Sequence, residues 1–336
     1  MEAIKACYSA GSVGLLAPLQ DFLDDEQVSE ILINKPQEVF IEREGTMLRF
    51  DIPVLTAPYL RRLFALIANE NKQSLSQDRP VLSGTLQDGS RVQLVIPPAV
   101  LHETLSVRKF TLKNMSFDEY AGLGFFSKAR GVSLDSGALS NEAHEELLRT
   151  LYHAANWPEF ITQAILFKKN ILISGGTSSG KTTFLNSCIQ KIPLSERLIT
   201  LEDTFEINVP HPNLVRLKTL KEVGEATQQV SMHDLVQASL RLRPDRLIMG
   251  EIRGREIFDF VSACSTGHSG ALATIHANSP KIAFMRMAQL YKLNPIAGMD
   301  EKDIYKILHE VVDVIIQLAK TSEGRRLVEV YYKDAY

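Results

Sequence analysis

Apolar and polar positions in the first half of the chain alternate as they do in β-strands. Between residues 28 and 110, short apolar runs alternate with polar positions, as in half-buried strands. Asp88-Gly89 separates two such runs, which is a strong hairpin signal. The pattern predicts a helix at 60–68 and strands at 28–33, 38–41, 47–50, 82–86 and 91–96. A small α+β domain is therefore expected here.

The second half instead alternates buried-strand runs with helical periodicity. Strands are predicted at 171–174, 198–201, 214–217, 246–249 and 271–275. Helices are predicted at 142–155, 157–167, 183–191, 232–242, 255–265 and 282–291. This order is typical of an α/β domain whose mostly parallel sheet is covered on both faces. A terminal hairpin, 314–318 and 327–332, is expected to add antiparallel strands.

The predicted domain boundaries follow from these two patterns of apolar and polar positions. Residues 1–112 form the N-terminal α+β domain, and residues 141–336 form the larger α/β domain. Residues 113–140 contain several glycines and few long apolar runs, so they are predicted to be a linker with a short helix near 116–121.

Composition narrows the class of protein. The chain has 336 residues, 45% of them hydrophobic, and a formal net charge of −3, which argues against a strongly basic surface that wraps nucleic acid. Its three cysteines are odd in number and lack C-x-x-C spacing, which favours a reducing compartment. The sequence shows neither a long apolar run nor a signal peptide, so we expect a cytoplasmic protein with only peripheral membrane contact.

The most informative motif is a glycine-rich loop between a predicted strand and a predicted helix. It has the pattern G-x-x-x-x-G-K-[ST], in which backbone N–H groups and the helix N-terminus bind phosphates. Lys181 is expected to reach the β- and γ-phosphates, and the Thr182 hydroxyl to ligate Mg²⁺. The predicted nucleotide-binding residues are Gly175, Gly176, Thr177, Ser178, Ser179, Gly180, Lys181, Thr182 and Thr183. This loop predicts ATP or GTP binding.

Two carboxylates follow other buried strands. Glu251 comes after Gly250, which occupies the position of the usual magnesium-binding Asp, so Glu251 is the candidate for orienting the attacking water. Glu202 is expected to contact the metal through water, with Glu206 as a weaker candidate. The alternative interpretations are a capping Glu for Glu251 and a solvated acidic turn for the other two.

Two histidines flank the strand predicted at 271–275. His268 is expected to hydrogen-bond the γ-phosphate and to report its loss, and His276 is a further candidate for nucleotide contact. A purely structural role remains open for either side chain. Chelation of a metal by them is not expected, since no other His or Cys has ligand spacing.

Taken together, these motifs resemble the secretion ATPases. The loop, the acidic run 201–206, the segment 241–254 and the segment 266–278 are similar to that superfamily's Walker A, Asp box, Walker B and His box. The residues of these motifs are most similar to those of the traffic ATPases of type IV secretion and conjugation machines. Segments 31–34, 88–91 and 105–109 also resemble that family's N-terminal domain.

The resemblance implies a RecA-like ATPase domain and a homohexameric ring at the cytoplasmic face of the inner membrane. It implies Mg²⁺-dependent ATP hydrolysis that drives pilus assembly and substrate export. The implied partners are other secretion ATPases, inner-membrane channel proteins and the secreted substrate; direct nucleic-acid binding is not expected.

The resemblance also implies that the nucleotide lies between the two domains, and that the linker lets them swing. Arg108 matches a family arginine that neutralises γ-phosphate charge, although a surface arginine at a strand edge is the alternative. Arg241, Arg243 and Arg253 are candidates for action across a subunit boundary.

Three other functions share part of this pattern. A type II secretion or type IV pilus motor has the same four boxes, although the paired-cysteine insert common in assembly motors is absent here. A nucleic-acid translocase would use the same ATP core but should show basic or aromatic tracking surfaces. A nucleotide-gated scaffold would keep the loop and lose Glu251.

Overall fold

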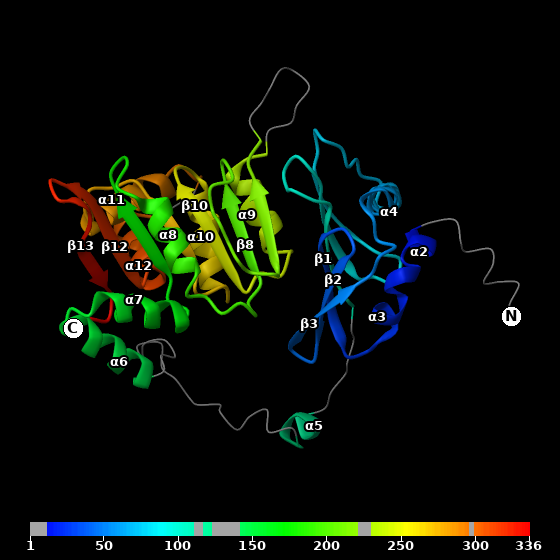
Figure 1. Cartoon of the computed structure of the whole chain (residues 1–336), viewed down its shortest axis with the longest axis horizontal. Helices are drawn as coiled ribbons and strands as arrows, with labels where there is room; N and C mark the ends of the chain where they lie inside the picture. Colours follow the sequence, from blue (N-terminus) through cyan, green and yellow to red (C-terminus); the bar gives the residue numbers. More distant parts are fainter. Residues whose placement is uncertain (1–11, 111–116, 123–141, 221–229, 296–298) are drawn as a thin grey trace, which may run out of the picture.

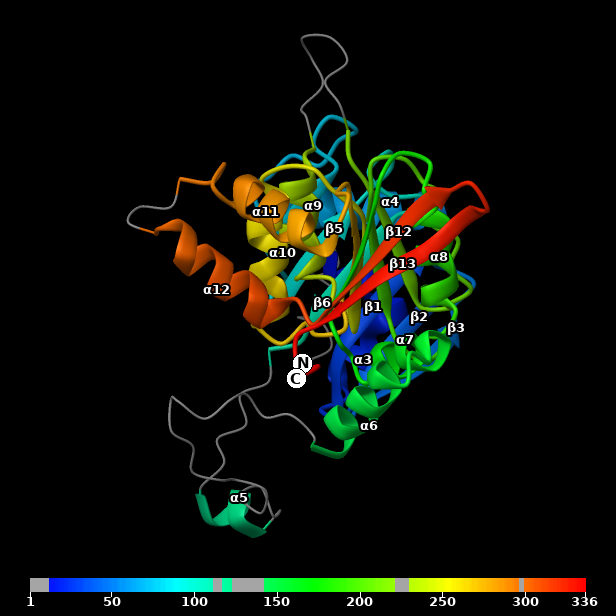
Figure 2. The same ribbon diagram turned by 90° about the vertical axis from the view of Figure 1, so that its left-hand side faces the viewer.

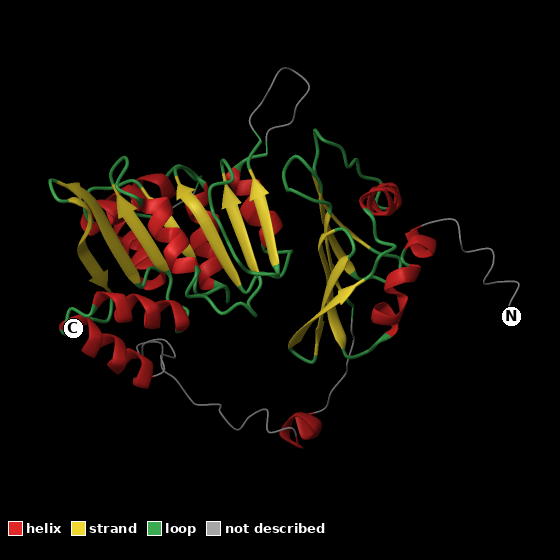
Figure 3. Ribbon diagram, in the orientation of Figure 1, coloured by secondary structure: helices red, strands yellow, loops and turns green. Residues whose placement is uncertain are grey.

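A computed structural model describes residues 12–110, 117–122, 142–220, 230–295 and 299–336. Its strands form two separate sheets, seen as the two yellow groups in Figure 3. Most of the predicted linker lies outside the described residues, apart from the short helix α5 (Phe117–Gly122). The predicted boundaries at 112 and 141 also fall outside the described residues and stay predictions.

The first sheet is antiparallel and has six strands in the order β3-β2-β1-β6-β5-β4. Its strands are β1 (Val28–Lys35), β2 (Glu38–Arg43), β3 (Thr46–Asp51), β4 (Val81–Thr85), β5 (Arg91–Val95) and β6 (Thr104–Arg108). The helical elements are α2 (Ser12–Leu15), the 3-10 turn η1 (Ala17–Leu19), α3 (Gln20–Asp24) and α4 (Ala57–Glu70). Figure 1 shows that the helices cover the face of this sheet that points away from the second sheet.

Helix α4 illustrates why these residues fold locally as they do. The hydroxyl of Thr56 accepts a hydrogen bond from the amide of Tyr59 and caps the helix. The apolar residues of α4 recur at helical spacing and are buried against apolar side chains of the sheet. This packing gives the first sheet a hydrophobic core of its own.

The second sheet carries the phosphate-binding motif. Its seven strands have the order β13-β12-β7-β11-β10-β8-β9, and all neighbouring pairs are parallel except β12 with β13. They are β7 (Ile171–Gly175), β8 (Leu198–Glu202), β9 (Leu214–Lys218), β10 (Arg246–Ile252), β11 (Leu272–Ile275), β12 (Val314–Thr321) and β13 (Gly324–Tyr332). The predicted α/β arrangement is confirmed.

Helices cover both faces of the second sheet, which explains its continuous apolar strands. One face packs against α6 (Glu142–His153), α7 (Trp157–Leu166) and α8 (Lys181–Ile189). The other packs against α9 (Met232–Ser239), α10 (Glu256–Ser265), α11 (Pro280–Tyr291) and α12 (Glu301–Val311). Successive residues of β7 and β10 point to opposite cores, so no face of either strand meets solvent.

A polar and apolar seam joins the two sheets. Val95, Ala99 and Val100 pack into the core that lies beneath α9 and α10. The amide of Lys218, at the end of the edge strand β9, donates to the carbonyl of Ala99 at 2.8 Å. These contacts place the first sheet beside β9 rather than over the phosphate-binding loop (Figure 1).

The seam also contains two paired arginines. Arg197 is fully buried and donates from Nη1 to Oδ1 of Asn34 at 2.7 Å. Arg243 makes a bidentate pair with Glu42, at 2.7 and 2.8 Å. Because each pair joins residues far apart in the sequence, the seam is specified by side chains that no local pattern reveals.

Two expectations need correction. The terminal hairpin was expected to add antiparallel strands; its two strands do pair antiparallel, but β12 joins the sheet by pairing in parallel with β7. Helix α12 and the helices before β1 were not expected at all. The sequence contains a capping Asp300 before α12, whose side chain accepts from the amide of Asp303, so that helix had a readable start signal.

Candidate functional site

The loop after β7 has the geometry of a phosphate cradle. A Cβ on Gly175 would lie 2.3 Å from Oγ of Ser179 and 2.8 Å from the carbonyl oxygen of Leu318, so only glycine fits. Gly180 precedes α8 with a φ of 94°, in the left-handed region that glycine adopts readily. The loop therefore turns directly into the N-terminus of α8.

Several hydrogen-bond donors in this loop lack the acceptors that protein groups usually provide. No side chain caps the N-terminus of α8, which leaves its first amides without the usual acceptor. The buried hydroxyl of Ser179 has no hydrogen-bond partner among the described residues. Lys181 donates from Nζ to the carbonyls of Gly175 and Gly176, at 2.9 and 3.1 Å. Such convergent donors fit the phosphates of a nucleotide.

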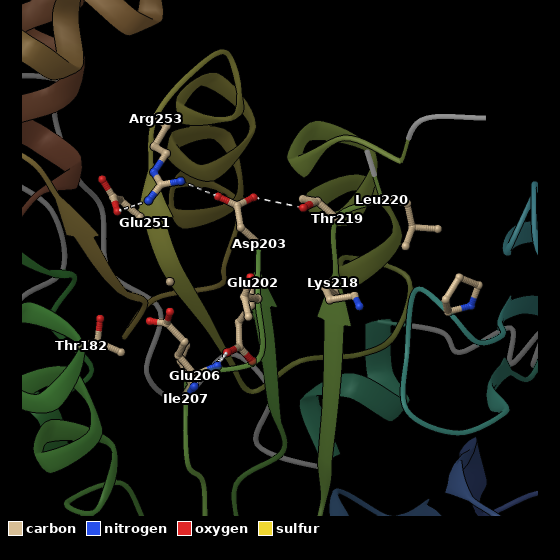
Figure 4. A pocket seen from close by; sticks show the side chains of 13 residues that line it. Thr182, Glu202, Asp203, Glu206, Ile207, Lys218, Thr219, Leu220, Glu251 and Arg253 are labelled. Carbon is tan, nitrogen blue, oxygen red and sulfur yellow. Dashed lines mark hydrogen bonds and ion pairs between the residues drawn. The ribbon is translucent and has the colours of Figure 1, made fainter. Parts of the chain in front are cut away.

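Beside the loop lies a cavity of about 570 Å³, lined by residues from the ends of several strands. Figure 4 shows Thr182, Glu251 and Arg253 toward one end of the cavity and Lys218 and Leu220 toward the other. Arg253 donates to Glu251 at 2.7 Å and to Asp203 at 2.9 Å. Asp203 also accepts from the hydroxyl of Thr219 at 3.0 Å. The chain of contacts fixes the Glu251 carboxylate on the cavity wall.

The environment keeps Glu251 charged. Burial alone would raise its pKa, but the hydrogen bond and charge of Arg253, helped by Lys181, hold the pKa of Glu251 below its usual value. Burial is also the main reason that the pKa of Lys181 lies below its usual value, partly offset by the charge of Glu251. The two predicted catalytic groups, Lys181 and Glu251, therefore interact electrostatically.

Glu202 lines the same cavity but is committed to internal contacts. Its side chain is buried and accepts from the amides of Glu206 and Ile207 at 2.7 and 2.8 Å. It also accepts from the hydroxyl of Thr200 at 2.8 Å and pairs with Arg216 at 3.2 Å. Glu202 thus organises the acidic turn, whereas Glu206 is exposed and lines the cavity.

The two histidines lie at opposite ends of β11. His276 follows the strand, and its Nε2 lies 3.4 Å from Oγ1 of Thr177 in the phosphate loop. His268 precedes the strand and lines a second cavity of about 640 Å³ at the seam, together with Arg108, Arg241 and Arg243. The structure therefore brings His276, but not His268, to the loop of its own chain.

Arg108, like His268, lies away from the phosphate loop of its own chain. It lies at the end of β6, where its Nε is 3.6 Å from Oε1 of Glu30. Arg243 precedes β10 and Glu251 lies near its far end, so the two cavities are roughly 20 Å apart along that strand. In this arrangement Arg108 does not lie at the phosphate loop of its own chain.

The donor set around Thr182 suits a hard cation only in company with other oxygens. No group of three or more His, Cys, Asp or Glu side chains with metal-binding geometry occurs among the described residues. The Thr182 hydroxyl, phosphate oxygens and water are the ligands that Mg²⁺ takes in such sites, so the loop fits a magnesium nucleotide.

Three arginines near the site acquire roles that sequence reasoning missed. Arg216 pairs with Glu202, Arg253 holds Glu251, and Arg325 donates from Nε to the carbonyl of Ser178 at 3.0 Å. Arg325 belongs to β13, 147 residues beyond Ser178 in the loop that it touches. Only the pairing of β12 with β7 brings it there, and no local signal reveals that pairing.

These features define a phosphate-loop protein, and comparison with known families identifies the kind. A family model described as "Type II/IV secretion system protein" matches residues 15–323. The chain belongs to this family. None of the helices described has the length and apolar character needed to cross a bilayer.

The relatives point to the type IV branch. "Type IV secretion system protein VirB11" of Bartonella quintana is 36% identical over 326 residues, covering 94% of this chain and 91% of the relative. "Protein VirB11" of Agrobacterium fabrum is 33% identical over 305 residues, covering 90% and 88%. The crystal structure of the VirB11 ATPase of Brucella suis, in complex with sulphate, matches with a TM-score of 0.89 and 33% identity over 97% of this chain and 99% of that chain. The resemblance to the type IV secretion ATPases is confirmed.

Proposed function

We propose that this chain is a Mg²⁺-dependent ATPase with a RecA-like core, which powers type IV secretion as a homohexameric ring. The observation that carries the proposal is that Thr182 and Glu251 line one cavity at the carboxyl ends of parallel strands, with Lys181 interacting electrostatically with Glu251. Ligands of open α/β sheets bind at this edge.

The residues supply the groups that phosphoryl transfer requires. The loop amides and Lys181 bind the phosphates and offset their charge. Glu251, kept ionised by Arg253, accepts a hydrogen bond from the attacking water and orients it toward the γ-phosphorus. Asp203 fixes Arg253 from the other side and so keeps the carboxylate in place.

The Thr182 hydroxyl would help to hold a magnesium ion, which would supply positive charge to neutralise the phosphates. Glu202 is proposed to contact that shell through water, which requires one of its oxygens to leave Arg216. His276 is proposed to contact the nucleotide through Thr177, its neighbour in the loop.

Arg108 and His268 are proposed to act on the nucleotide of a second copy. Both lie at the seam, away from the loop of their own chain, and Arg108 is exposed enough to reach outward. Arg241 and Arg243 line the same cavity and would accompany them. A ring supplies such a neighbour to every subunit.

The relatives named above are components of type IV secretion systems, and this supports a matching place for the chain. We propose a peripheral position at the cytoplasmic face of the inner membrane. The proposed partners are other secretion ATPases, inner-membrane channel proteins and the secreted substrate.

The decisive experiment pairs phosphate release with light scattering after size exclusion, with and without a non-hydrolysable ATP analogue. The proposal expects ATP turnover, its loss in Lys181→Ala, and a hexamer in at least one nucleotide state. Wild-type turnover by Lys181→Ala, or a monomer under every condition, would contradict it.

A further inference from the structure

The terminal hairpin touches the phosphate loop from a side that the proposed mechanism leaves unused. β12 runs parallel to β7 with Leu318 opposite Gly175, so the hairpin continues alongside the loop. Figure 2 shows β13 beside α8 at this edge of the sheet. The residue that makes the contact is Arg325, the second residue of β13.

Arg325 meets the loop at two points. Its Nε donates to the carbonyl of Ser178 at 3.0 Å. A Cβ placed on Gly180 would lie 3.0 Å from Cδ of Arg325, so the arginine stem lies directly against the residue that begins α8. Ser178 has a φ of 60°, an uncommon conformation for a residue with a side chain. A charge-assisted hydrogen bond to its carbonyl stabilises that conformation.

The charge of Arg325 is also poorly matched to the protein around it. A cation near a helix N-terminus is electrostatically unfavourable, because the helix dipole is positive there. No salt bridge from Arg325 to a carboxylate is found among the described residues. A polyphosphate on the loop would supply the missing negative charge.

We infer that Arg325 is a positioning residue for the nucleotide. It holds the Ser178 carbonyl from outside, so that the amides of the loop stay turned toward the phosphates, and it adds positive charge beside them. This inference rests on the proposed function, because it assumes that the loop binds a nucleoside triphosphate. The hairpin thereby becomes a part of the nucleotide site contributed by the far end of the described chain.

The test uses Arg325→Met, which keeps the apolar stem over Gly180 and removes both charge and donor. Arg326→Met is the matched control, since Arg326 is adjacent and exposed and donates only to the carbonyl of Arg325 among the contacts described. A fluorescent ATP analogue reports affinity, and phosphate release reports KM and kcat. We expect Arg325→Met to raise Kd and KM about fivefold to tenfold with kcat nearly unchanged, as for lost uniform binding.

Lys181→Ala is run alongside to separate the two claims. If Lys181→Ala loses binding while Arg325→Met equals Arg326→Met, the inference about Arg325 fails and the proposed function stands. If Lys181→Ala binds as the wild type does, the proposed function itself fails. A lowered melting temperature of Arg325→Met with unchanged KM would show a merely structural contact and also overturn the inference. Arg325→Lys should recover part of the affinity, because it restores the charge without the planar fork.

Discussion

The two ends of β10 and β11 carry groups of similar chemistry that the fold keeps apart. At the carboxyl end, Glu251 and His276 lie with the phosphate loop; at the amino end, Arg243 and His268 lie at the seam with Arg108. The motifs run continuously through both ends in the sequence. Two residues of the same sequence motif can therefore lie at opposite ends of a strand.

The two ends also differ in whether the groups of a single chain complete a site. The carboxyl-end site brings the Glu251 carboxylate and the Thr182 hydroxyl to a single cavity, with Lys181 next to Thr182 in the loop. The seam site presents arginines to a cavity between the two sheets, with Arg91 and Arg108 directly opposite each other on β5 and β6. Like charges in such a pair repel, so the seam gains most from an added anion.

The largest expected effect tests the carboxyl-end site. Glu251→Gln should lower turnover about 10³-fold while ATP binding persists, because the amide cannot orient the water as the carboxylate does. Glu206→Gln, on the exposed part of the same cavity, should change turnover little. Phosphate release and a binding titration measure both. Equal losses in the two variants would remove the special role of Glu251.

The second prediction tests whether the seam serves another copy. Arg108→Ala should lower turnover about 10²-fold, since a positioned arginine offsets transition-state charge. Mixed with Lys181→Ala, it should regain part of the activity, because some interfaces then join an intact loop to an intact Arg108. Each variant assayed alone is the control, and no gain on mixing would restrict Arg108 to its own chain.

The third prediction concerns the stability of the seam. Burial, partly offset by Arg108 and Arg243, raises the pKa of Glu30 to about 7. The folded state then binds the proton more tightly than the unfolded state, so stability falls as pH rises from about 4.5 to about 7. The wild type should lose about 3 kcal/mol over this window relative to Glu30→Gln, since one pKa unit corresponds to about 1.4 kcal/mol. Urea unfolding at several pH values measures the difference, and parallel profiles would contradict it.

The smallest effect sharpens the electrostatics of the catalytic cavity. Arg253→Met should raise the pKa of Glu251, since the guanidinium now holds it low. The acid limb of the kcat/KM profile should therefore move to higher pH, with turnover at neutral pH reduced about fivefold. Arg255→Met is an exposed neighbouring control. An unmoved acid limb would show that Glu251 is not the titrating group.

There is a physical reason why the sequence predicts that the loop and Glu251 lie at the same edge of the sheet. Glycines at 175 and 180, the lysine at 181 and the buried strand before them are local requirements of one loop, so they appear together in the chain. The parallel sheet then forces the ends of β7, β8 and β10 to the same edge, which brings Glu251 to Thr182 without further information.

The features that could not be predicted from the sequence depend on contacts between distant segments. The place of Arg108 follows from the docking of the first sheet beside β9, through pairs such as Arg197 with Asn34. The contact of Arg325 follows from the parallel pairing of β12 with β7. Neither leaves a periodicity or a motif, because each is a match between surfaces far apart along the chain.

The position of β12 has a practical consequence for trimming the protein. β7 is buried along its whole length and is flanked by β11 on one side and β12 on the other. Deleting the hairpin would bare one ladder of N–H and C=O groups on a buried, mostly apolar strand, which is a template for intermolecular β-pairing. Such a shortened chain should accumulate in inclusion bodies during expression.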